Sequence, residues 1–388
     1  MNHKQKPKLL VFIDYFLPGY KAGGPIKSVN NIITSLSPNF DFDIITSDRD
    51  LGDKLPYQNI EFNSWISKDK YSIIYLNKKD VTKWLKKHFK ENYYHACYFN
   101  SLYAKEFTLK PLLFFNKLNT PPKLILAPRG MLGKGAIDAK PSFLPIKPIK
   151  KKSFLLLSHV TGFFKHVTWH TTNKLEKQDV IDYFGSKSNI KIASNISINK
   201  VNRKEIVKIK DELKLVFFSR ISPKKNLLYT LELLKNIPNV SLTIYGSIEE
   251  DIYWNRCIDF IQANNINADY KGEVIPADVN SILSNYHFFI LPTLHENYGH
   301  VITEALTAGC GLIISDKTPW RNLSSKKIGW DLDLKNQEKI IETIKYCLAI
   351  DQDEYNIIRN NCYNFVEQEI NSTKEIEDTI KLFIDNES

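Results

Sequence analysis

Residues 288–304 read FFILPTLHENYGHVITE, and the fold of the chain is best inferred outward from this stretch. The apolar run Phe288–Leu291 predicts a buried strand, and the residues after Gly299 place apolar side chains at helical spacing. A short polar loop with Glu296 and Asn297 joins the two. Because a helix that starts after a glycine-bearing turn leaves backbone N–H groups facing that turn, the stretch predicts an anion-binding site.

Two carboxylates accompany this predicted anion site. Glu296 lies in the loop and Glu304 on the helix, with seven residues between them. Since a carboxylate repels a phosphate, the two side chains would instead accept hydrogen bonds from neutral hydroxyl groups beside it. Hydroxyl acceptors next to an anion site indicate a nucleotide sugar. The alternative is an ordinary strand, turn and helix with solvated glutamates.

A second loop carries positive charge. It follows the apolar run Leu213–Phe218 and contains Arg220 and Lys225, with four residues between them, ahead of a predicted helix. A guanidinium that binds phosphate through two hydrogen bonds and a nearby ammonium can neutralise a leaving diphosphate. A pair of solvated surface charges is the alternative.

Together these motifs resemble a known enzyme family. Glu296-x7-Glu304, followed directly by ALTAG, and Arg220-x4-Lys225 are similar to the signature of retaining glycosyltransferases with the two-domain GT-B fold. Within that fold the chain resembles family 4. The sequence Pro-Arg-Gly at residues 128–130 resembles the subgroup that acts on surface polysaccharides.

Chain length and strand pattern predict a matching architecture. A chain of 388 residues exceeds the size of one typical domain, and short apolar runs alternate with helical stretches. We therefore expect an α/β protein, and the resemblance implies GT-B: two Rossmann-like, doubly wound domains that face a cleft. The expected parts are an acceptor-binding domain at residues 1–200, a nucleotide-sugar-binding domain at 201–370, and a C-terminal helix at 371–388 that packs back on the first domain.

The resemblance also implies roles for individual residues. The donor would be bound by Gly23, Gly24, Arg220, Lys225, Gly272, Glu296, Asn297, Tyr298, Gly299 and Glu304. Of these, Arg220, Lys225 and Glu296 would be catalytic. Arg129, at the end of a predicted strand, and His170 would contact the acceptor or the sugar, with structural roles as the alternatives. No Asp-x-Asp motif stands where a metal-dependent transferase would carry one, so neither a metal nor another cofactor is expected.

Three positions depart from the family pattern. Ser219 and Asn226 stand where glycine is common, and Gly311 stands where proline is frequent. None of the three removes a charged or hydroxyl-binding group, so only the local geometry is expected to differ.

The net charge of +10 is unevenly placed, because the first 200 residues are strongly basic and the remainder is acidic. Residues 134–165 concentrate lysines among aromatic and aliphatic residues, which suits peripheral contact with an anionic membrane. A core helix with a solvated basic side explains the stretch equally well. A nucleic-acid-binding protein would also be basic, but these residues form no recognisable nucleic-acid module, so no nucleic-acid partner is expected.

The expected function is transfer of a sugar, with retention, from a nucleotide-diphosphate sugar to a hydroxyl of an acceptor glycan. The resemblance implies a lipid-linked acceptor and a role in bacterial surface polysaccharide (O-antigen, capsule or exopolysaccharide). An enzyme that hydrolyses or epimerises a nucleotide sugar without an acceptor is the alternative. The five cysteines are scattered, and no apolar run reaches the roughly 20 residues of a membrane-spanning helix. We therefore expect a cytoplasmic protein, with peripheral contact at the inner face of the plasma membrane.

Overall fold

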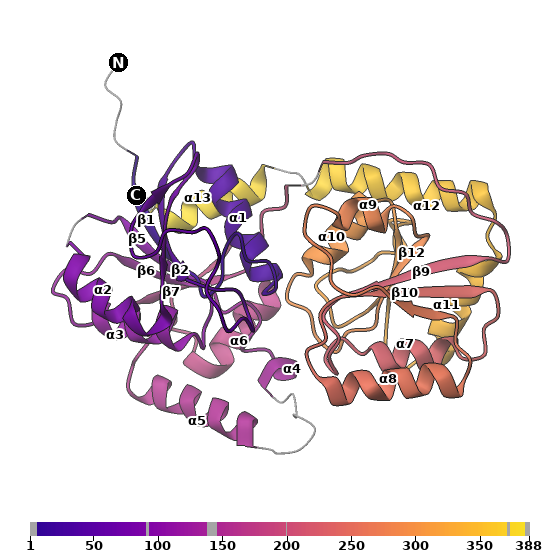
Figure 1. Cartoon of the computed structure of the whole chain (residues 1–388), viewed down its shortest axis with the longest axis horizontal. Helices are drawn as coiled ribbons and strands as arrows, with labels where there is room; N and C mark the ends of the chain where they lie inside the picture. The colour runs from indigo at the N-terminus through magenta and orange to yellow at the C-terminus, as the bar shows by residue number, and fades with distance from the viewer. Residues whose placement is uncertain (1–5, 91–92, 138–145, 199, 371–372, 385–388) are drawn as a thin grey trace. The chain divides into compact units, whose positions relative to one another are not determined.

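The computed structural model describes residues 6–90, 93–137, 146–198, 200–370 and 373–384 of the chain. The chain divides into two compact units: unit 1 comprises residues 1–196 and 373–388, and unit 2 comprises residues 197–372. Each unit is built on its own β-sheet with helices packed against it (Figure 1). The contacts thus divide the chain a few residues away from the positions expected from the sequence, 200 and 370.

The sheet of unit 1 has the strand order β3-β4-β2-β1-β5-β6-β7-β8. Its strands are β1 (Lys8–Phe12), β2 (Asp41–Ser47), β3 (Ile66–Ser67), β4 (Ser72–Leu76), β5 (Ala96–Phe99), β6 (Lys123–Leu126), β7 (Val167–Thr171) and β8 (Ile190–Ile192). Apart from β3, which is antiparallel to β4, neighbouring strands are parallel. Continuous apolar runs such as the fully buried Leu9 and Leu10 suit such a sheet, because helices cover both of its faces.

Helices connect the strands of unit 1. They are α1 (Gly24–Leu36), η1 (Lys78–Asp80), α2 (Val81–His88), η2 (Lys105–Leu109), α3 (Lys110–Phe115), α4 (Lys134–Ile137), α5 (Ile146–Val160) and α6 (Lys174–Phe184). The alternation of strand and helix is the doubly wound arrangement that the sequence predicts.

The last helix, α13 (Lys374–Phe383), belongs to unit 1 although it follows unit 2 in the chain (Figure 1). Its Phe383 ring packs edge-on against the rings of Phe40 and Tyr98, with centroids 5.6 Å away in both cases. A ring nitrogen of His95 lies 3.1 Å from the Phe383 carbonyl oxygen. The C-terminal helix is therefore part of the core of unit 1, as predicted.

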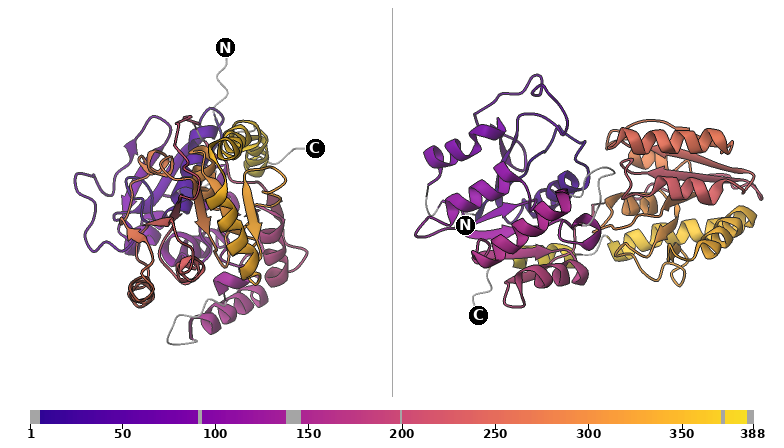
Figure 2. Two further views of the ribbon diagram at one scale, coloured as in Figure 1. Left: turned by 90° about the vertical axis from the view of Figure 1, so that its right-hand side faces the viewer. Right: turned by 90° about the horizontal axis from the view of Figure 1, so that it is seen from below.

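The sheet of unit 2 has the order β11-β10-β9-β12-β13-β14, and all neighbouring strands are parallel. Its strands are β9 (Leu213–Phe218), β10 (Val240–Tyr245), β11 (Ala268–Tyr270), β12 (Phe288–Leu291), β13 (Gly311–Ser315) and β14 (Gly329–Leu332). Its helices are α7 (Leu227–Leu234), α8 (Asp251–Ala263), α9 (Val279–Leu283), α10 (His300–Thr307), α11 (Gln337–Ala349), α12 (Gln352–Phe365) and η3 (Val366–Ile370). They cover both faces of the sheet (Figure 2).

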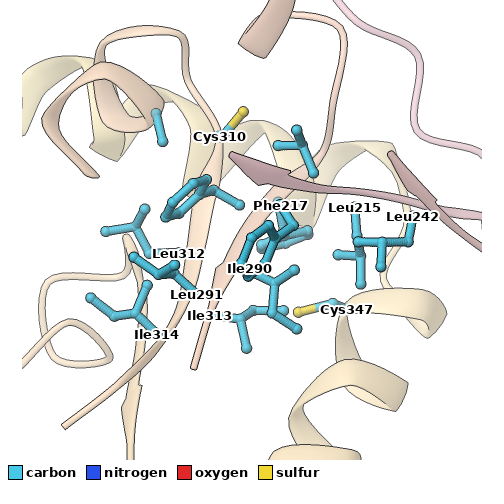
Figure 3. Packing of buried hydrophobic residues seen from close by; sticks show 14 of the residues in the cluster. Leu215, Phe217, Leu242, Ile290, Leu291, Cys310, Leu312, Ile313, Ile314 and Cys347 are labelled. Carbon is cyan, nitrogen blue, oxygen red and sulfur yellow. The ribbon is translucent and has the colours of Figure 1, made fainter. Parts of the chain in front are cut away.

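The central strands supply the core of unit 2. Phe217 of β9, Ile290 of β12 and Ile313 of β13 lie in one buried cluster with Cys347 of α11 (Figure 3). All five cysteines of the chain are buried free thiols. Among the described helices, none combines the length and the apolar composition needed to cross a bilayer.

The polar composition of residues 194–211 predicts an interdomain linker, and the chain passes from unit 1 to unit 2 within this range, between residues 196 and 197. Residues 200–211, however, belong to unit 2, and Val201 and Ile206 pack against its core. The buried ammonium group of Lys208 donates hydrogen bonds to the carbonyl oxygens of Leu348 (3.0 Å) and Ile350 (3.1 Å) at the end of α11. A cation at a helix C-terminus is favourable because the last carbonyl groups lack partners within the helix. One buried lysine thus fixes a segment whose composition is that of a loop.

Candidate functional site

The chain of unit 2 changes direction at the centre of its sheet. From β9 it moves outward to β10 and β11, and it returns through β12 to build β13 and β14 on the other side. The adjacent strands β9 and β12 therefore lead to opposite edges. In open α/β sheets, ligands bind at the carboxyl ends of the strands at such a switch point. The loops that follow these strands, residues 219–226 and 292–299, form the candidate site.

Hydrogen bonds hold the two loops together. The carbonyl oxygen of Lys224 accepts from the backbone N–H of Leu294 (2.9 Å) and from the hydroxyl of Thr293 (3.1 Å). The Asn226 side-chain amide donates to the carbonyl oxygen of Pro292 (3.1 Å). Asn226 also precedes α7 with φ 63°, a left-handed conformation that asparagine tolerates better than most residues. The asparagine can therefore replace the glycine of the family pattern.

Lys225 and Glu296 form an ion pair between these loops. The Lys225 Nζ lies 2.5 Å from the Glu296 Oε2, and the side chains are only 11% and 16% exposed. Burial alone would raise the pKa of the Glu296 carboxyl. The charge and hydrogen bond of Lys225, aided by Lys224 and by the Asn297 N–H, outweigh burial and lower this pKa to about 2. Glu296 is therefore ionised at neutral pH, and it accepts hydrogen bonds without serving as a proton donor.

The turn after Glu296 requires glycine at position 299. Gly299 has φ 78°, and a Cβ atom there would lie 2.8 Å from the Cδ1 of Ile302 and 3.0 Å from the Cγ of Glu296. It directly precedes α10, whose first turn has no side-chain cap. Such a helix start, with N–H groups and the positive end of the dipole facing the turn, is typical of anion sites.

Tyr298 supports this turn from within unit 2. Its hydroxyl lies 2.7 Å from the Ser197 hydroxyl, and its carbonyl oxygen accepts a 2.6 Å hydrogen bond from the Trp320 indole N–H. The backbone N–H of Glu296 donates to the carbonyl oxygen of Lys317 (2.9 Å), which joins the same turn to the loop after β13. The side chain of Tyr298 is therefore bonded to the scaffold of unit 2.

The other predicted donor residues of unit 2 follow the carboxyl ends of its strands or lie on α10. Arg220 follows β9 and is exposed, with its Nη1 2.9 Å from the Oε1 of Glu249. Glu304 is half-buried in the second turn of α10. Gly272 follows β11, and its carbonyl oxygen accepts from the Gly246 N–H at the end of β10 (2.9 Å). The structure thus brings Lys225, Glu296 and Asn297 into direct contact, whereas Arg220 is bonded to a different carboxylate.

Two charged residues at this edge of the sheet were not predicted from the sequence. Glu249, which precedes α8, is the carboxylate that pairs with Arg220. Lys224 lies next to Lys225 in the chain, and burial, with the neighbouring Lys225 charge, lowers the pKa of its ammonium to about 8. The adjacent lysines Lys224 and Lys225 could have indicated from the sequence that Lys224 also lies at the site. No local signal pointed to Glu249.

In unit 1, three neutral groups hold the guanidinium of Arg129. Its Nε donates to the side-chain oxygen of Asn100 (2.6 Å), its Nη1 to that of Asn195 (2.6 Å), and its Nη2 to the hydroxyl of Tyr98 (2.8 Å). None of these acceptors is charged, and within the described residues Arg129 forms no ion pair. The guanidinium is therefore fixed in place without neutralisation by a directly paired carboxylate.

His170 shares a hydrogen-bond partner, the Tyr98 hydroxyl, with Arg129. Its Nδ1 lies 2.8 Å from the Tyr98 hydroxyl and its Nε2 lies 2.9 Å from the Ala193 carbonyl oxygen. Burial, together with the charge of Arg129, lowers the pKa of this imidazole to about 3, so the ring is neutral. Both ring nitrogens are bonded and the side chain is buried, so this geometry corresponds to the structural alternative for His170.

Gly23 and Gly24 lie at the start of α1, beyond the carboxyl end of β1. Gly23 has φ 67° and no side chain caps this helix. The Asn100 amide that binds Arg129 also donates to the Pro25 carbonyl oxygen in the first turn of α1 (3.3 Å). The two glycines and Arg129 are thus linked through one side chain.

Within the described part of the chain, no three His, Cys, Asp or Glu side chains gather in a way that would hold a metal ion. The charged groups at the candidate site are Lys224, Lys225 and Arg220, with Glu296 bonded to Lys225 and Glu249 bonded to Arg220.

Known proteins resemble this chain in two ways: a family model matches unit 2, and solved structures match the fold of nearly the whole chain. Residues 199–365 match the family model of glycosyl transferases group 1. A search of curated protein sequences gives no match. Together with the fold, the family match supports a transferase enzyme.

Three solved structures illustrate the fold similarity. TarM of S. aureus, as a mutant in complex with fondaparinux, alpha-GlcNAc-glycerol and UDP, has a TM-score of 0.69 at 13% identity over 97% of this chain and 99% of its own. HepE of Anabaena with UDP-glucose has 0.67 at 13% over 97% and 99%. WaaG, a glycosyltransferase involved in lipopolysaccharide biosynthesis, has 0.65 at 12% over 98% and 100%. The chain therefore has the predicted GT-B fold.

Proposed function

We propose that the chain transfers a sugar from a nucleotide-diphosphate sugar to a hydroxyl group of an acceptor glycan, with retention at the anomeric carbon. The observation that carries this proposal is the buried Lys225–Glu296 pair at the β9/β12 switch point, beside the uncapped start of α10. Groups suited to phosphate thus lie directly against a carboxylate suited to sugar hydroxyls.

The proposed reaction breaks the bond between C1 of the sugar and a phosphate oxygen, so negative charge develops on the leaving diphosphate. Lys225, Arg220 and the first N–H groups of α10 would stabilise that charge. Ionised Glu296 would accept hydrogen bonds from the sugar, and Glu304 from the ribose. The acceptor oxygen forms the new bond on the same face of C1, and its proton passes to the departing phosphate. This scheme uses neither a protein nucleophile nor a metal ion.

For unit 1 we propose acceptor binding. Arg129 presents a positioned guanidinium at the carboxyl edge of the sheet, and guanidinium groups bind phosphates and carboxylates well. The acceptor we favour is a glycan carried on a lipid phosphate during assembly of a bacterial surface polysaccharide. Gly23 and Gly24 would let a phosphate approach the start of α1 closely.

A thermal-shift panel of UDP, GDP, ADP, TDP and CMP, each with its sugar conjugates, tests the donor site. We expect one nucleotide family to raise the melting temperature by mass action, by the equivalent of about 2.7 kcal/mol at a hundred times Kd. Arg220→Ala and Glu304→Ala should reduce the shift to half or less, Arg203→Ala should keep it, and EDTA should leave it unchanged. If no nucleotide raises the melting temperature, the proposal is wrong. Release of nucleotide that depends on added acceptor separates transfer from hydrolysis.

Helix α5 supports peripheral contact with an anionic membrane. Four apolar side chains share its outer face with 62–74% exposure: Ile149, Leu156, Leu157 and Val160. At helical spacing, the exposed Lys150 and Lys152 flank this stripe on either side, while Leu155 points inward. The helix lies at the periphery of unit 1 (Figure 1). An apolar stripe flanked by lysines is typical of helices that lie in a lipid interface.

The two halves of this pattern can be tested separately with phosphatidylglycerol vesicles. Leu156→Glu/Leu157→Glu should abolish sedimentation with the vesicles, because it removes apolar area and adds repulsion. Lys150→Gln/Lys152→Gln should weaken it by about 1 kcal/mol per lysine, an effect that disappears in high salt. Ile252→Glu, at an equally exposed apolar position in α8, is the control. Lys151 is left unchanged, because its ammonium donates to the Ala136 carbonyl oxygen. Undiminished sedimentation of both double variants would exclude α5 as the contact. Residues 138–145 of the predicted patch lie outside the described residues.

A further inference from the structure

Lys224 lies at the switch point of unit 2, but no role has been assigned to its side chain. Its backbone is fixed, because its carbonyl oxygen binds both Thr293 and Leu294 of the loop after β12. Its side chain is half-buried, and within the described residues nothing accepts a hydrogen bond from its ammonium group. Neighbouring cations differ in this respect, since Lys225 and Arg220 each have a carboxylate partner.

The charges around Lys224 are those of the two ion pairs. The cations Lys225 and Arg220 destabilise its protonated form, and the carboxylates Glu296 and Glu249 stabilise it. The ammonium is therefore within electrostatic range of both pairs, at the place where the proposed diphosphate would bind. The cations Lys224, Lys225 and Arg220 and the two carboxylates together carry a net charge of about +1. Lys225 and Arg220 are each paired with a carboxylate, so the excess positive charge is that of Lys224.

We infer that Lys224 is a third cation for the donor diphosphate and that it takes up a proton when the diphosphate binds. This inference rests on the proposed function and adds an unassigned residue and a pH dependence to it. The bound diphosphate supplies the acceptor that the ammonium lacks, and its negative charge favours the protonated lysine. No covalent bond changes: the proton comes from the buffer and is returned when the nucleotide leaves.

The sign of the pH dependence follows from linkage. Burial and Lys225 lower the pKa of free Lys224 to about 8, and a bound diphosphate raises it. Below about pH 7 the lysine is protonated in both states, so affinity does not depend on its titration. Above about pH 8 the free protein must gain a proton on binding, so affinity falls by up to about tenfold per pH unit. The phosphate groups do not contribute, because their last pKa is near 6.

Calorimetric titration of the full chain with the nucleoside diphosphate that the thermal-shift panel selects tests this inference. At pH 8.5, in buffers of different ionisation enthalpy, wild type should take up more than about half a proton per nucleotide. Lys224→Gln should take up none and bind about tenfold more weakly at pH 7. Lys224→Arg should also take up none and keep its affinity up to pH 9, since arginine remains charged. Unchanged melting temperatures would show that both variants fold.

Two results would overturn the inference, and they differ in what they say of the donor site. If wild type binds nucleotide without proton uptake and Lys224→Gln binds equally well, Lys224 has no part in a site that nonetheless exists. If no nucleoside diphosphate binds to wild type, the proposed function fails and the inference with it. Lys326→Ala, which removes an exposed lysine of unit 2 bonded to Glu369, controls for the loss of one charge.

Discussion

Replacing Lys225 with alanine is expected to lower the rate of sugar transfer by about 10²–10³-fold, because it removes a buried positive charge from the place proposed for the leaving diphosphate. The same change leaves the Glu296 carboxylate without the cation to which it is bonded at 2.5 Å. Breaking one side of a buried pair costs about 3–5 kcal/mol of unfolding free energy. Lys225→Ala should therefore reduce both activity and stability, measured by initial rates and by denaturant unfolding.

A second substitution separates the two effects. Lys225→Ala/Glu296→Gln removes the stranded charge, so it should recover most of the lost stability but none of the activity. Lys326→Ala breaks an exposed pair in the same unit and should change neither quantity appreciably. Full recovery of activity in the double variant would contradict a role of Lys225 in transfer.

The pH dependence of stability provides a further check on the Lys225–Glu296 pair. The pKa of Glu296 in the folded protein is about 2, below its ordinary value of 4.5. A depressed carboxyl pKa contributes stability that is present above about pH 4.5 and is lost as the pH falls toward 2. In Lys225→Ala the pKa of Glu296 should rise, so this contribution to acid stability should disappear from the unfolding curves.

Part of this architecture follows from local sequence. Strand β9 occupies the predicted residues Leu213–Phe218, and β12 the predicted Phe288–Leu291, because uninterrupted apolar runs suit parallel strands that are covered on both faces. The positions of Arg220, Lys225 and Glu296 at strand ends follow from the same pattern. Local sequence thus places the charged residues at one edge of a sheet.

Local sequence did not reveal which charges pair with one another. Lys225 and Glu296 are 71 residues apart, and Arg220 and Glu249 are 29 apart, so their contacts depend on the strand order. Arg129 is similarly held by side chains that follow or belong to other strands, which no spacing within one element could indicate. The polar composition of residues 194–211 predicts a linker, and the boundary between the units lies within it, but composition does not show that Lys208 binds the end of α11.

The second large effect is expected on nucleotide binding when Arg220, which pairs with Glu249, is replaced. Arg220→Ala should weaken binding of the nucleotide about tenfold to a hundredfold, the usual range for hydrogen bonds to a charged group. It should lower the transfer rate at least as much, because charge on the diphosphate increases as the bond breaks. The side chains of Arg220 and Glu249 are 44% and 45% exposed, so their ion pair contributes at most about 1 kcal/mol to folding. Nearly unchanged unfolding curves should accompany the loss of binding.

Glu249→Gln should have the opposite effect on binding. In the structure the Glu249 carboxylate is paired with the Arg220 guanidinium, so it would compete with the proposed diphosphate for that group. Because glutamine holds a cation less strongly, nucleotide affinity in titration calorimetry should increase severalfold, and more at low salt than at high salt. Arg203→Ala, which removes an arginine of matching exposure paired with Glu367, should leave affinity unchanged. If Glu249→Gln instead weakens binding as much as Arg220→Ala does, Glu249 positions the arginine for the nucleotide. Opposite signs for the two variants would mean that the exposed pair is broken when the donor binds.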